Sequence, residues 1–245
     1  MNEPTRIAMW SGPRNISTAL MRSFGARADT TVIDEPFYAA YLVATGLQHP
    51  MREEVIASQP PDWQEVVKAL LGPVPDGKSI CYQKHMTHHM HETFGRDWIG
   101  KVRNAFLIRD PREVLASYVR KRDEVALADI GVVQQRELFE HEADRLGVAP
   151  PVIECASVLA NPAAALSRLC AAIGIPFSPA MLNWPPGRRS TDGVWAPAWY
   201  DAVERSTCFA APREPQSVRL PARLEKLADQ AMPHYRAIAA YRLAC

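Results

Sequence analysis

The sequence predicts an α/β protein in which a central, mostly parallel sheet lies between two layers of helices. Short apolar runs bounded by turn residues alternate along the chain with longer segments of helical spacing. Such alternation is typical of right-handed βαβ crossovers, whose helices cover both faces of a sheet. The chain has 245 residues, of which 47% are hydrophobic and 22% charged, and it contains no internal repeat or low-complexity linker. We therefore expect one domain over residues 1–245.

The expected elements follow one another in strand–helix order. Five apolar runs are candidate buried strands: Arg6–Trp10, Thr31–Ile33, Ser79–Gln83, Asn104–Ile108 and Val152–Glu154. Six segments have amphipathic helical spacing: Ser17–Arg27, Trp63–Leu71, Arg112–Arg122, Val132–Leu146, Ala163–Ile173 and Pro221–Tyr241. Ligands bind beyond the carboxyl ends of parallel strands, so functional residues are expected where each strand ends.

Composition excludes several classes of protein and partner. Lys and Arg number 28 against 27 Asp and Glu, and this near balance argues against a nucleic-acid polymer or a membrane surface as partner. Five scattered cysteines without a C-x-x-C pair indicate a reducing compartment. The first six residues form no apolar signal core, and no apolar run approaches the roughly 18 residues of a membrane span. We expect a cytoplasmic protein, and the sequence predicts no particular oligomeric state.

The segment after the first strand has the features of an anion-binding loop. A Gly-Pro turn before a helix brings backbone N–H groups and the positive end of the helix dipole to one point. Arg14 adds a charge, and Ser17 and Thr18 add hydroxyl donors suited to phosphate or sulfate oxygens. Alternatively, the two hydroxyl residues only cap the helix and Arg14 is solvated. A kinase-type P-loop would place Gly and Lys at positions 17 and 18, which weakens an ATP interpretation.

A second anion site is predicted after the fourth strand. Asp110 is a suitable N-cap and Pro111 occupies a favoured first-turn position, so a helix begins directly after Arg109. Ser117 follows Arg109 by eight residues, about two helical turns, which places it on the same side of that helix. The alternative is a loop pair between Arg109 and Asp110 with Ser117 at the surface.

These two segments resemble the sulfotransferases that use 3′-phosphoadenosine 5′-phosphosulfate (PAPS). The run Pro13-Arg14-Asn15-Ile16-Ser17-Thr18 is similar to their loop Pro-[Lys/Arg]-Ser-Gly-Thr-Thr, with Asn15 and Ile16 in place of serine and glycine. Arg109, Pro111 and Ser117 match their pattern Arg-x-Pro-x-x-x-x-x-Ser, which holds the 3′-phosphate. The resemblance implies a P-loop NTPase-like fold, PAPS as sulfuryl donor, no metal, and a small-molecule acceptor with a hydroxyl or amine. It implies cofactor contacts along the first loop by Gly12, Pro13, Arg14, Asn15, Ile16, Ser17 and Thr18.

The resemblance also implies catalytic residues. Lys84-His85 follows the third strand and resembles a Lys-Thr-His sequence whose lysine contacts the transferring group and whose histidine is the base. Glu35-Pro36 resembles the Glu-Pro pair of carbohydrate-type sulfotransferases, in some of which the glutamate is the base. A carboxyl whose pKa is raised by burial could take the acceptor proton. Glu35 and His85 are both candidate bases, with Lys84 and Arg14 as the charged catalytic residues. Alternatively, Asp34 or Glu35 caps the next helix, and the histidines between positions 85 and 91 form a polar helix surface or a metal site.

A late loop completes the expected site. Arg188, Arg189, Gly193 and Trp195 loosely resemble the family loop that closes over the 3′-phosphate and adenine, although Ala196 stands where a lysine is expected. The two arginines could contact a phosphate, or could lie on a solvated loop. Two other functions are weighed against a sulfotransferase. One is a P-loop nucleotide-dependent kinase, and the other is a non-catalytic nucleotide-binding scaffold in which Ile16 and Ala196 mark lost chemistry.

Overall fold

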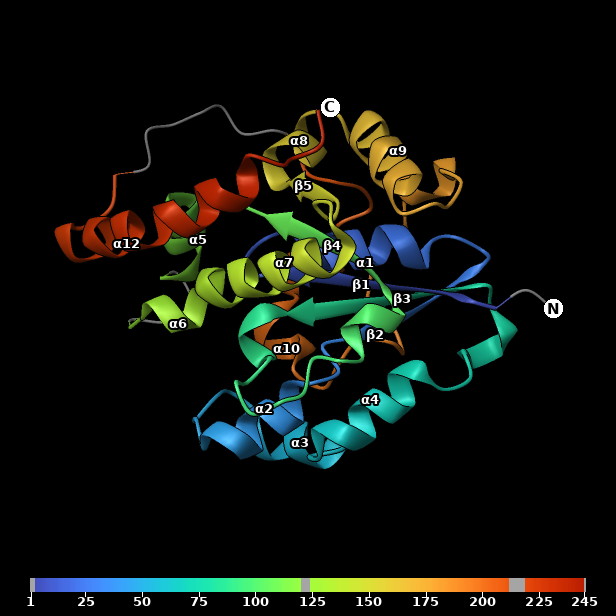
Figure 1. The fold of residues 1–245 in the computed structure, drawn as a ribbon, viewed down its shortest axis with the longest axis horizontal. Coiled ribbons are helices and arrows are strands. Elements are labelled where there is room, and N and C mark those ends of the chain that lie inside the picture. The colour runs from blue at the N-terminus through green and yellow to red at the C-terminus, as the bar shows by residue number, and fades with distance from the viewer. Residues whose placement is uncertain (1–2, 120–123, 212–218, 245) are drawn as a thin grey trace.

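A five-stranded parallel sheet with the order β2-β3-β1-β4-β5 forms the centre of the protein (Figure 1). The computed structural model describes residues 3–119, 124–211 and 219–244. The strands are β1 (Thr5–Ser11), β2 (Thr30–Asp34), β3 (Ile80–Met86), β4 (Arg103–Ile108) and β5 (Val152–Glu154). Because β1 lies between β3 and β4, the loop after β1 starts at the middle of the sheet.

The helices connect and flank these strands. The α-helices are α1 (Ser17–Gly25), α2 (Tyr38–Thr45), α3 (Arg52–Ser58), α4 (Trp63–Leu71), α5 (Pro111–Tyr118), α6 (Leu127–Ile130), α7 (Val132–Leu146), α8 (Cys155–Ala160), α9 (Pro162–Ala172), α10 (Ala196–Trp199), α11 (Asp201–Glu204) and α12 (Ala222–Ala239). Short 3₁₀ turns are η1 (Pro75–Gly77), η2 (Thr87–His89), η3 (Ile99–Lys101) and η4 (Pro179–Leu182).

The two faces of the sheet are covered by different helices. Ile7 and Met9 of β1 pack in a buried cluster with side chains of α1, α8 and α9. Ala8 and Trp10 point to the opposite face and pack with side chains of α4, α7 and α12. Alternate residues of a strand point to opposite faces, so burial of all four follows from helices on both sides. The predicted three-layer α/β/α fold is confirmed.

The third strand is longer than the sequence predicts. It continues to Met86 because it pairs with β1 along one edge and with β2 along the other. The expectation that Lys84 and His85 follow the strand is therefore wrong, since both lie inside it. As consecutive strand residues, they point to opposite faces of the sheet.

Helix boundaries differ from expectation in two further places. The helix expected over Arg112–Arg122 is described as α5 (Pro111–Tyr118), and residues 120–123 lie outside the described part of the chain. Between β2 and β3 the structure has α2 and α3, which none of the six predicted amphipathic segments covers, although the capping alternative placed a helix directly after Glu35. Apolar residues surround nearly the whole of α2, so it lacks the amphipathic period that identifies a surface helix.

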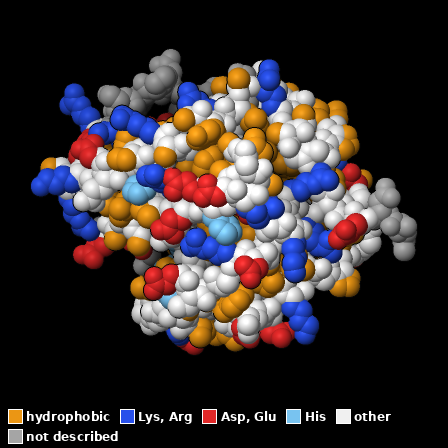
Figure 2. All heavy atoms as spheres, in the orientation of Figure 1, with side chains coloured by type: hydrophobic (Ala, Val, Ile, Leu, Met, Phe, Trp, Pro, Cys, Tyr) orange, Lys and Arg blue, Asp and Glu red, His pale blue; other side chains and the backbone are white. Residues whose placement is uncertain are grey.

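Charged side chains of both signs are interspersed on the face shown in Figure 2, in keeping with the near-neutral total. Within the described residues, no helix is long and apolar enough to cross a membrane. The four described cysteines, Cys81, Cys155, Cys170 and Cys208, are free thiols.

Candidate functional site

The loop between β1 and α1 has an unusual backbone. Arg14 and Ile16 have φ angles of 61° and 53°. Both angles lie in the left-handed region, which residues other than glycine seldom adopt and β-branched residues such as Ile adopt least. Ile16 stands at the glycine position of the family pattern and is the N-cap of α1, where it makes no side-chain cap hydrogen bond. The alternative that Ser17 and Thr18 cap this helix is therefore wrong. The first-turn N–H groups lack intrahelical acceptors, and the N-cap side chain supplies none.

Close packing fixes this loop against the sheet and α6. A Cβ atom on Gly12 would lie 2.5 Å from the backbone oxygen of Ile130, so only glycine fits there. The Asn15 side chain is buried and donates from Nδ2 to the backbone oxygen of Leu107, at 3.3 Å. The Cys155 thiol donates to the backbone oxygen of Asn15, at 3.0 Å. The structure thus gives Gly12 and Asn15 parts in holding the loop in place.

The two predicted anion-binding segments come into direct contact. Nε of Arg14 donates to the hydroxyl of Ser117 at 3.0 Å, and Nη1 of Arg109 donates to the backbone oxygen of Arg14 at 2.6 Å. Asp110 caps α5 as predicted, because its side chain accepts from a first-turn N–H at 2.8 Å. The alternative pair between Arg109 and Asp110 is wrong, since Nε of Arg109 bonds Glu113 at 2.9 Å. Three expected ligand-binding side chains therefore meet at one edge of the sheet.

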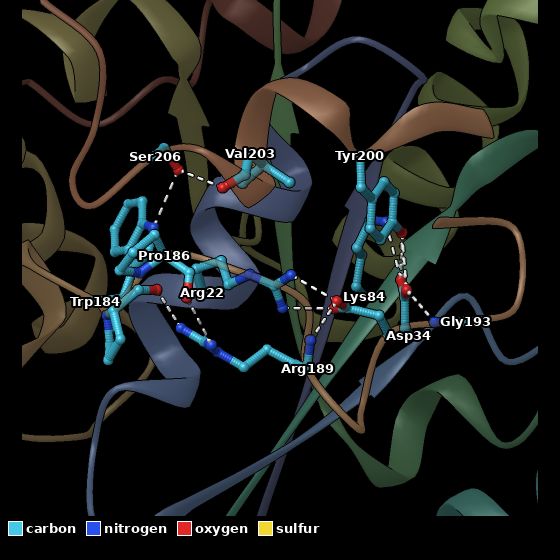
Figure 3. Close-up of polar contacts among 12 residues, drawn as sticks. Arg22, Asp34, Lys84, Trp184, Pro186, Arg189, Gly193, Tyr200, Val203 and Ser206 are labelled. Atoms are coloured by element: carbon cyan, nitrogen blue, oxygen red, sulfur yellow. Dashed lines mark hydrogen bonds and ion pairs between the residues drawn. The ribbon is translucent and has the colours of Figure 1, made fainter. Parts of the chain in front are cut away.

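A buried group of four polar residues, the Lys84 cluster, lies at the ends of β2 and β3. It comprises Asp34, Glu35, Lys84 and Tyr200. Nζ of Lys84 lies 2.9 Å from Oδ1 of Asp34 and 2.5 Å from the hydroxyl of Tyr200, which Figure 3 labels. It also lies 2.7 Å from Oε1 of Glu35. Asp34 and Lys84 face each other because they are paired in register across the two parallel strands. The helix-cap alternative for the two carboxylates is wrong, since the N-cap of α2 is Phe37 and makes no side-chain cap bond.

Burial and charge act in opposite directions inside the Lys84 cluster. Burial alone lowers the pKa of Lys84, but the carboxylates of Asp34 and Glu35 outweigh it and raise the pKa, so the ammonium stays charged. Burial raises the pKa of Glu35; the charge of Lys84 opposes this rise and that of Asp34 adds to it. Burial, followed by the two carboxylates, raises the pKa of Tyr200 well above its usual value. Glu35 is thus a carboxyl whose pKa moves toward neutrality.

His85 lies away from this cluster, on the opposite face of β3. Its ring stacks on Trp10 with centroids 4.5 Å apart, and its Nε2 lies 3.2 Å from Oε1 of Gln83. Burial lowers the pKa of His85 to about 3, so the ring is neutral and packed in the core. The imidazole near Glu35 belongs to His89, whose Nδ1 lies 3.9 Å from Oε2 of the carboxyl. The structure therefore does not bring His85 to the other candidate catalytic residues.

The late loop reaches the Lys84 cluster through Gly193. Its Asp192 accepts two hydrogen bonds from Arg22 of α1, at 2.5 and 2.7 Å, and the two side chains are 0% and 3% exposed (Figure 3). The next N–H, of Gly193, donates to Oδ2 of Asp34 at 3.1 Å. The loop is thereby tied both to the first helix and to the end of β2.

The two arginines of this loop lie in different surroundings. Arg189 donates from its guanidinium to the backbone oxygens of Pro185 and Pro186 in its own loop. Arg188 is exposed. Arg189 therefore stabilises the turn of its own loop.

Comparison with known proteins decides the family. A family model described as a sulfotransferase domain matches residues 5–242. The chain belongs to the sulfotransferase family. Among solved structures, this sulfotransferase-family chain is similar to the sulfotransferase domain from the curacin biosynthetic pathway, with a TM-score of 0.60 and 16% identity over the full length of both. It is also similar to the sulfotransferase domain of the Synechococcus PCC 7002 olefin synthase, with a TM-score of 0.58, 18% identity and coverage of 100% and 98%. At these identities the likeness concerns the fold.

Two curated plant relatives carry a different name. The sulfotransferase-family chain is 35% identical to branched-chain-amino-acid aminotransferase-like protein 1 of Arabidopsis thaliana over 87% of its own length and 38% of that protein. It is 32% identical to protein 2 of the same name and plant over 94% of its length and 40% of that protein. The chain thus spans about two fifths of the length of these relatives, and they share this sulfotransferase-family region with it.

Some residues of the site escape sequence reasoning. Asp34 carried a weak signal, because a carboxyl that ends a strand next to Glu35 lies at the ligand edge of the sheet. Tyr200 stood out only as one of several late aromatic residues, and nothing in the sequence indicated its contact with Lys84, 116 positions earlier. The pairing of Arg22 with Asp192 is equally remote, at 170 positions. Within the described residues, no group of three or more His, Cys, Asp or Glu side chains could hold a metal ion.

Proposed function

We propose that this chain is a PAPS-dependent sulfotransferase, acting as one domain, that transfers a sulfuryl group to a hydroxyl or amine of a small-molecule acceptor. The observation that carries the proposal is the contact of Arg14 with Ser117, which joins the two phosphate-binding segments beside the uncapped start of α1. Two anion-binding segments at one place suit a nucleotide that carries phosphate at both its 5′ and 3′ positions. The free thiols of the described cysteines support a reducing compartment, and we place the enzyme in the cytoplasm.

The chain offers donors that fit such a nucleotide. We assign the 5′-phosphosulfate to the loop at residues 12–18, where the N–H groups of α1 and Arg14 converge. Arg109 and Ser117 are assigned to the 3′-phosphate, since both approach Arg14 from the start of α5 and its far end. Arg188 and Arg189 are assigned only an added positive charge toward a phosphate, since Arg189 bonds to backbone oxygens of its own loop and Arg188 is exposed. PAPS, when bound, supplies the sulfuryl group and leaves as 3′,5′-ADP.

The catalytic roles follow from the Lys84 cluster. Glu35 is the proposed base, because its pKa is raised by burial and its Oε2 is not bound to Lys84. It takes the proton of the acceptor hydroxyl as that oxygen bonds to sulfur. Lys84 and Arg14 stabilise the negative charge that develops on the transferring group and on the departing phosphate. His85 is not assigned a role, since it packs in the core on the other face of β3.

Calorimetric titration with 3′,5′-ADP and with Mg-ATP tests the proposal. We expect metal-free binding of 3′,5′-ADP that Arg109→Ala weakens by about tenfold or more, the loss of one charge-assisted contact. The matched control is Arg136→Ala, which removes an exposed arginine paired with Glu140 on α7. Preference for Mg-ATP would contradict the proposal in favour of a kinase. Binding of 3′,5′-ADP without sulfation of any acceptor in a hydroxyl and amine library would instead support a scaffold.

A further inference from the structure

Asp34 and Glu35 are neighbours in sequence and both reach Lys84, yet their surroundings differ. Both oxygens of Asp34 are occupied: Oδ1 accepts from Lys84 at 2.9 Å, and Oδ2 accepts from the N–H of Gly193 at 3.1 Å. The hydroxyl of Tyr200 lies 2.9 and 2.8 Å from the two oxygens (Figure 3). The Asp34 side chain is only 2% exposed. Its carboxylate is therefore saturated with donors and shielded from solvent.

Glu35 has one occupied oxygen and one that is less constrained. Its Oε1 accepts from Lys84 at 2.7 Å and lies 3.4 Å from the hydroxyl of Tyr200. Its Oε2 lies 3.9 Å from Nδ1 of His89, beyond hydrogen-bond distance, and the side chain is 10% exposed. The backbone of Glu35 has a φ of 40°, an uncommon angle for a residue with a side chain. The fold therefore holds Glu35 in a constrained position and leaves Oε2 without the donors that occupy Oε1.

We infer that Asp34 and Tyr200 are positioning residues, which hold the Lys84 ammonium at the end of β3 and leave Glu35 as the carboxyl of the cluster that exchanges a proton. The inference rests on the proposed function in one respect, because the proton exchanged in turnover would be that of the acceptor. The arrangement of the four side chains can be tested without an acceptor.

The charge balance of the cluster supports this division. Two ionised carboxylates and one ammonium leave an excess negative charge in a buried volume, which costs free energy unless one carboxyl takes a proton. Hydrogen bonds to a carboxyl favour its charged form, and Asp34 accepts more of them than Glu35 does. Glu35 is thus the carboxyl that is protonated first. The pKa of Glu35 is raised by burial, in agreement with this order.

Tyr200 links the cluster to the late part of the chain. Its hydroxyl donates to Asp34 and accepts from Lys84 and from Nε1 of Trp195, the last at 3.1 Å. Trp195 is itself only 1% exposed, so a buried side chain holds the Tyr200 hydroxyl in position. Lys84 thus has a buried oxygen from the C-terminal part of the chain as a third partner, besides its two carboxylates.

The groups that face Glu35 come from four segments of the chain. Asp34 ends β2 directly before Glu35, Lys84 lies in β3, His89 lies in η2, and Tyr200 lies between α10 and α11. Burial lowers the pKa of His89 well below its usual value, so this imidazole is neutral and contributes no charge. The protonation of Glu35 is therefore governed by Asp34, Lys84 and Tyr200.

Infrared difference titration of the protonated carboxyl band tests the inference, with Glu35→Gln used to assign the band. In Asp34→Asn, Glu35 loses a neighbouring negative charge and becomes the one carboxylate of the cluster that pairs with Lys84. The midpoint of the Glu35 titration should therefore fall by about one pH unit or more. In Tyr200→Phe the cluster loses a neutral hydrogen-bond donor while the ring stays packed. The midpoint of the Glu35 titration should therefore rise, by a smaller amount. Glu137→Gln removes an exposed carboxyl on α7 and is the matched control, which should leave the band unchanged.

A purely structural role for Asp34 and Tyr200 would not shift the Glu35 midpoint in opposite directions in the two variants. An unchanged midpoint in Asp34→Asn, or shifts of the same sign in both variants, would overturn the inference. If Asp34→Asn does not fold, the rise in Tyr200→Phe decides, and a fall or no change there overturns the inference. Calorimetry with 3′,5′-ADP on the wild-type protein separates the two proposals. If binding is absent, the proposed function fails, whereas the infrared shifts alone decide the role of Asp34 and Tyr200.

Discussion

Nε of Arg14 lies 3.0 Å from the hydroxyl of Ser117, a residue 103 positions later in the chain. This contact joins the loop after β1 to the far end of α5. The two strands that precede these segments are neighbours in the sheet, so their carboxyl ends deliver both side chains to the same edge. The donor site proposed for this sulfotransferase-family chain depends on that meeting.

Ser117→Ala should weaken binding of 3′,5′-ADP by about threefold to tenfold, the loss of one hydrogen bond to a charged group. Binding of 5′-AMP, which has no 3′-phosphate, should be unchanged. Calorimetry with both nucleotides measures the difference, and Ser167→Ala on the exposed face of α9 is the matched control. An equal loss for both nucleotides would contradict the assignment of Ser117 to the 3′-phosphate.

Ile16→Gly should give a more stable protein than Ile16→Ala, by about 1 kcal/mol in the free energy of unfolding. Both variants lose the half-buried side chain, but only glycine adopts a φ of 53° without strain, which costs other residues about 1–2 kcal/mol. In most positions glycine is the less stable of the two, so the order itself is informative. Urea unfolding measures it, and an alanine variant as stable as the glycine variant would show that the left-handed backbone is absent in solution.

Acid should destabilise the fold through buried neutral histidines. Burial lowers the pKa of His85 to about 3, and burial together with His49 lowers that of His88 to about 3. The unfolded chain binds these protons near pH 6.5, so stability is fully present above that pH and is lost as pH falls toward 3. Within that window, each histidine should lower the free energy of unfolding by about 1.4 kcal/mol for every pH unit of acidification.

The variant His85→Phe isolates one such histidine. It keeps a ring against Trp10 but cannot be protonated, so the slope of unfolding free energy between pH 6 and pH 4 should fall by about 1.4 kcal/mol per pH unit. Urea unfolding across that range provides the measurement. His141→Gln, an exposed histidine of α7, should leave the slope close to that of the wild type. An unchanged slope in His85→Phe would show that His85 is not buried in the neutral form.

Asp192→Ala should lower the free energy of unfolding by about 3–5 kcal/mol, because it leaves the buried Arg22 guanidinium without its partner. Replacing both residues together, as Arg22→Met with Asp192→Leu, should cost less than the single change, since no unpaired charge stays buried. Arg136→Ala breaks an exposed pair and should cost less than about 0.5 kcal/mol. Similar values for Asp192→Ala and Arg136→Ala would mean that the late loop does not pack against α1.

Local signals in the sequence were sufficient for much of the fold. The alternation of apolar runs with helical spacing predicted the parallel sheet and its two helical layers, and the turn chemistry at Asp110 and Pro111 located the start of α5. These features depend on residues close together in the chain, such as a cap and the N–H groups next to it. The boundary of β3 was misjudged because Lys84 and His85 near its end are polar, and only pairing with neighbouring strands shows that they are extended.

The sequence by itself determined the order of the elements and the two segments at which Arg14, Arg109 and Ser117 stand. The tertiary structure alone decided that Lys84 and His85 point to opposite faces, and that Tyr200 completes the Lys84 cluster. The physical reason is the range of the interactions involved. Helical spacing and capping arise between near neighbours in the chain, whereas burial and ion pairing depend on which distant elements pack together. A near-neutral chain can thus concentrate its charges in one buried cluster and one loop, at places that its composition does not reveal.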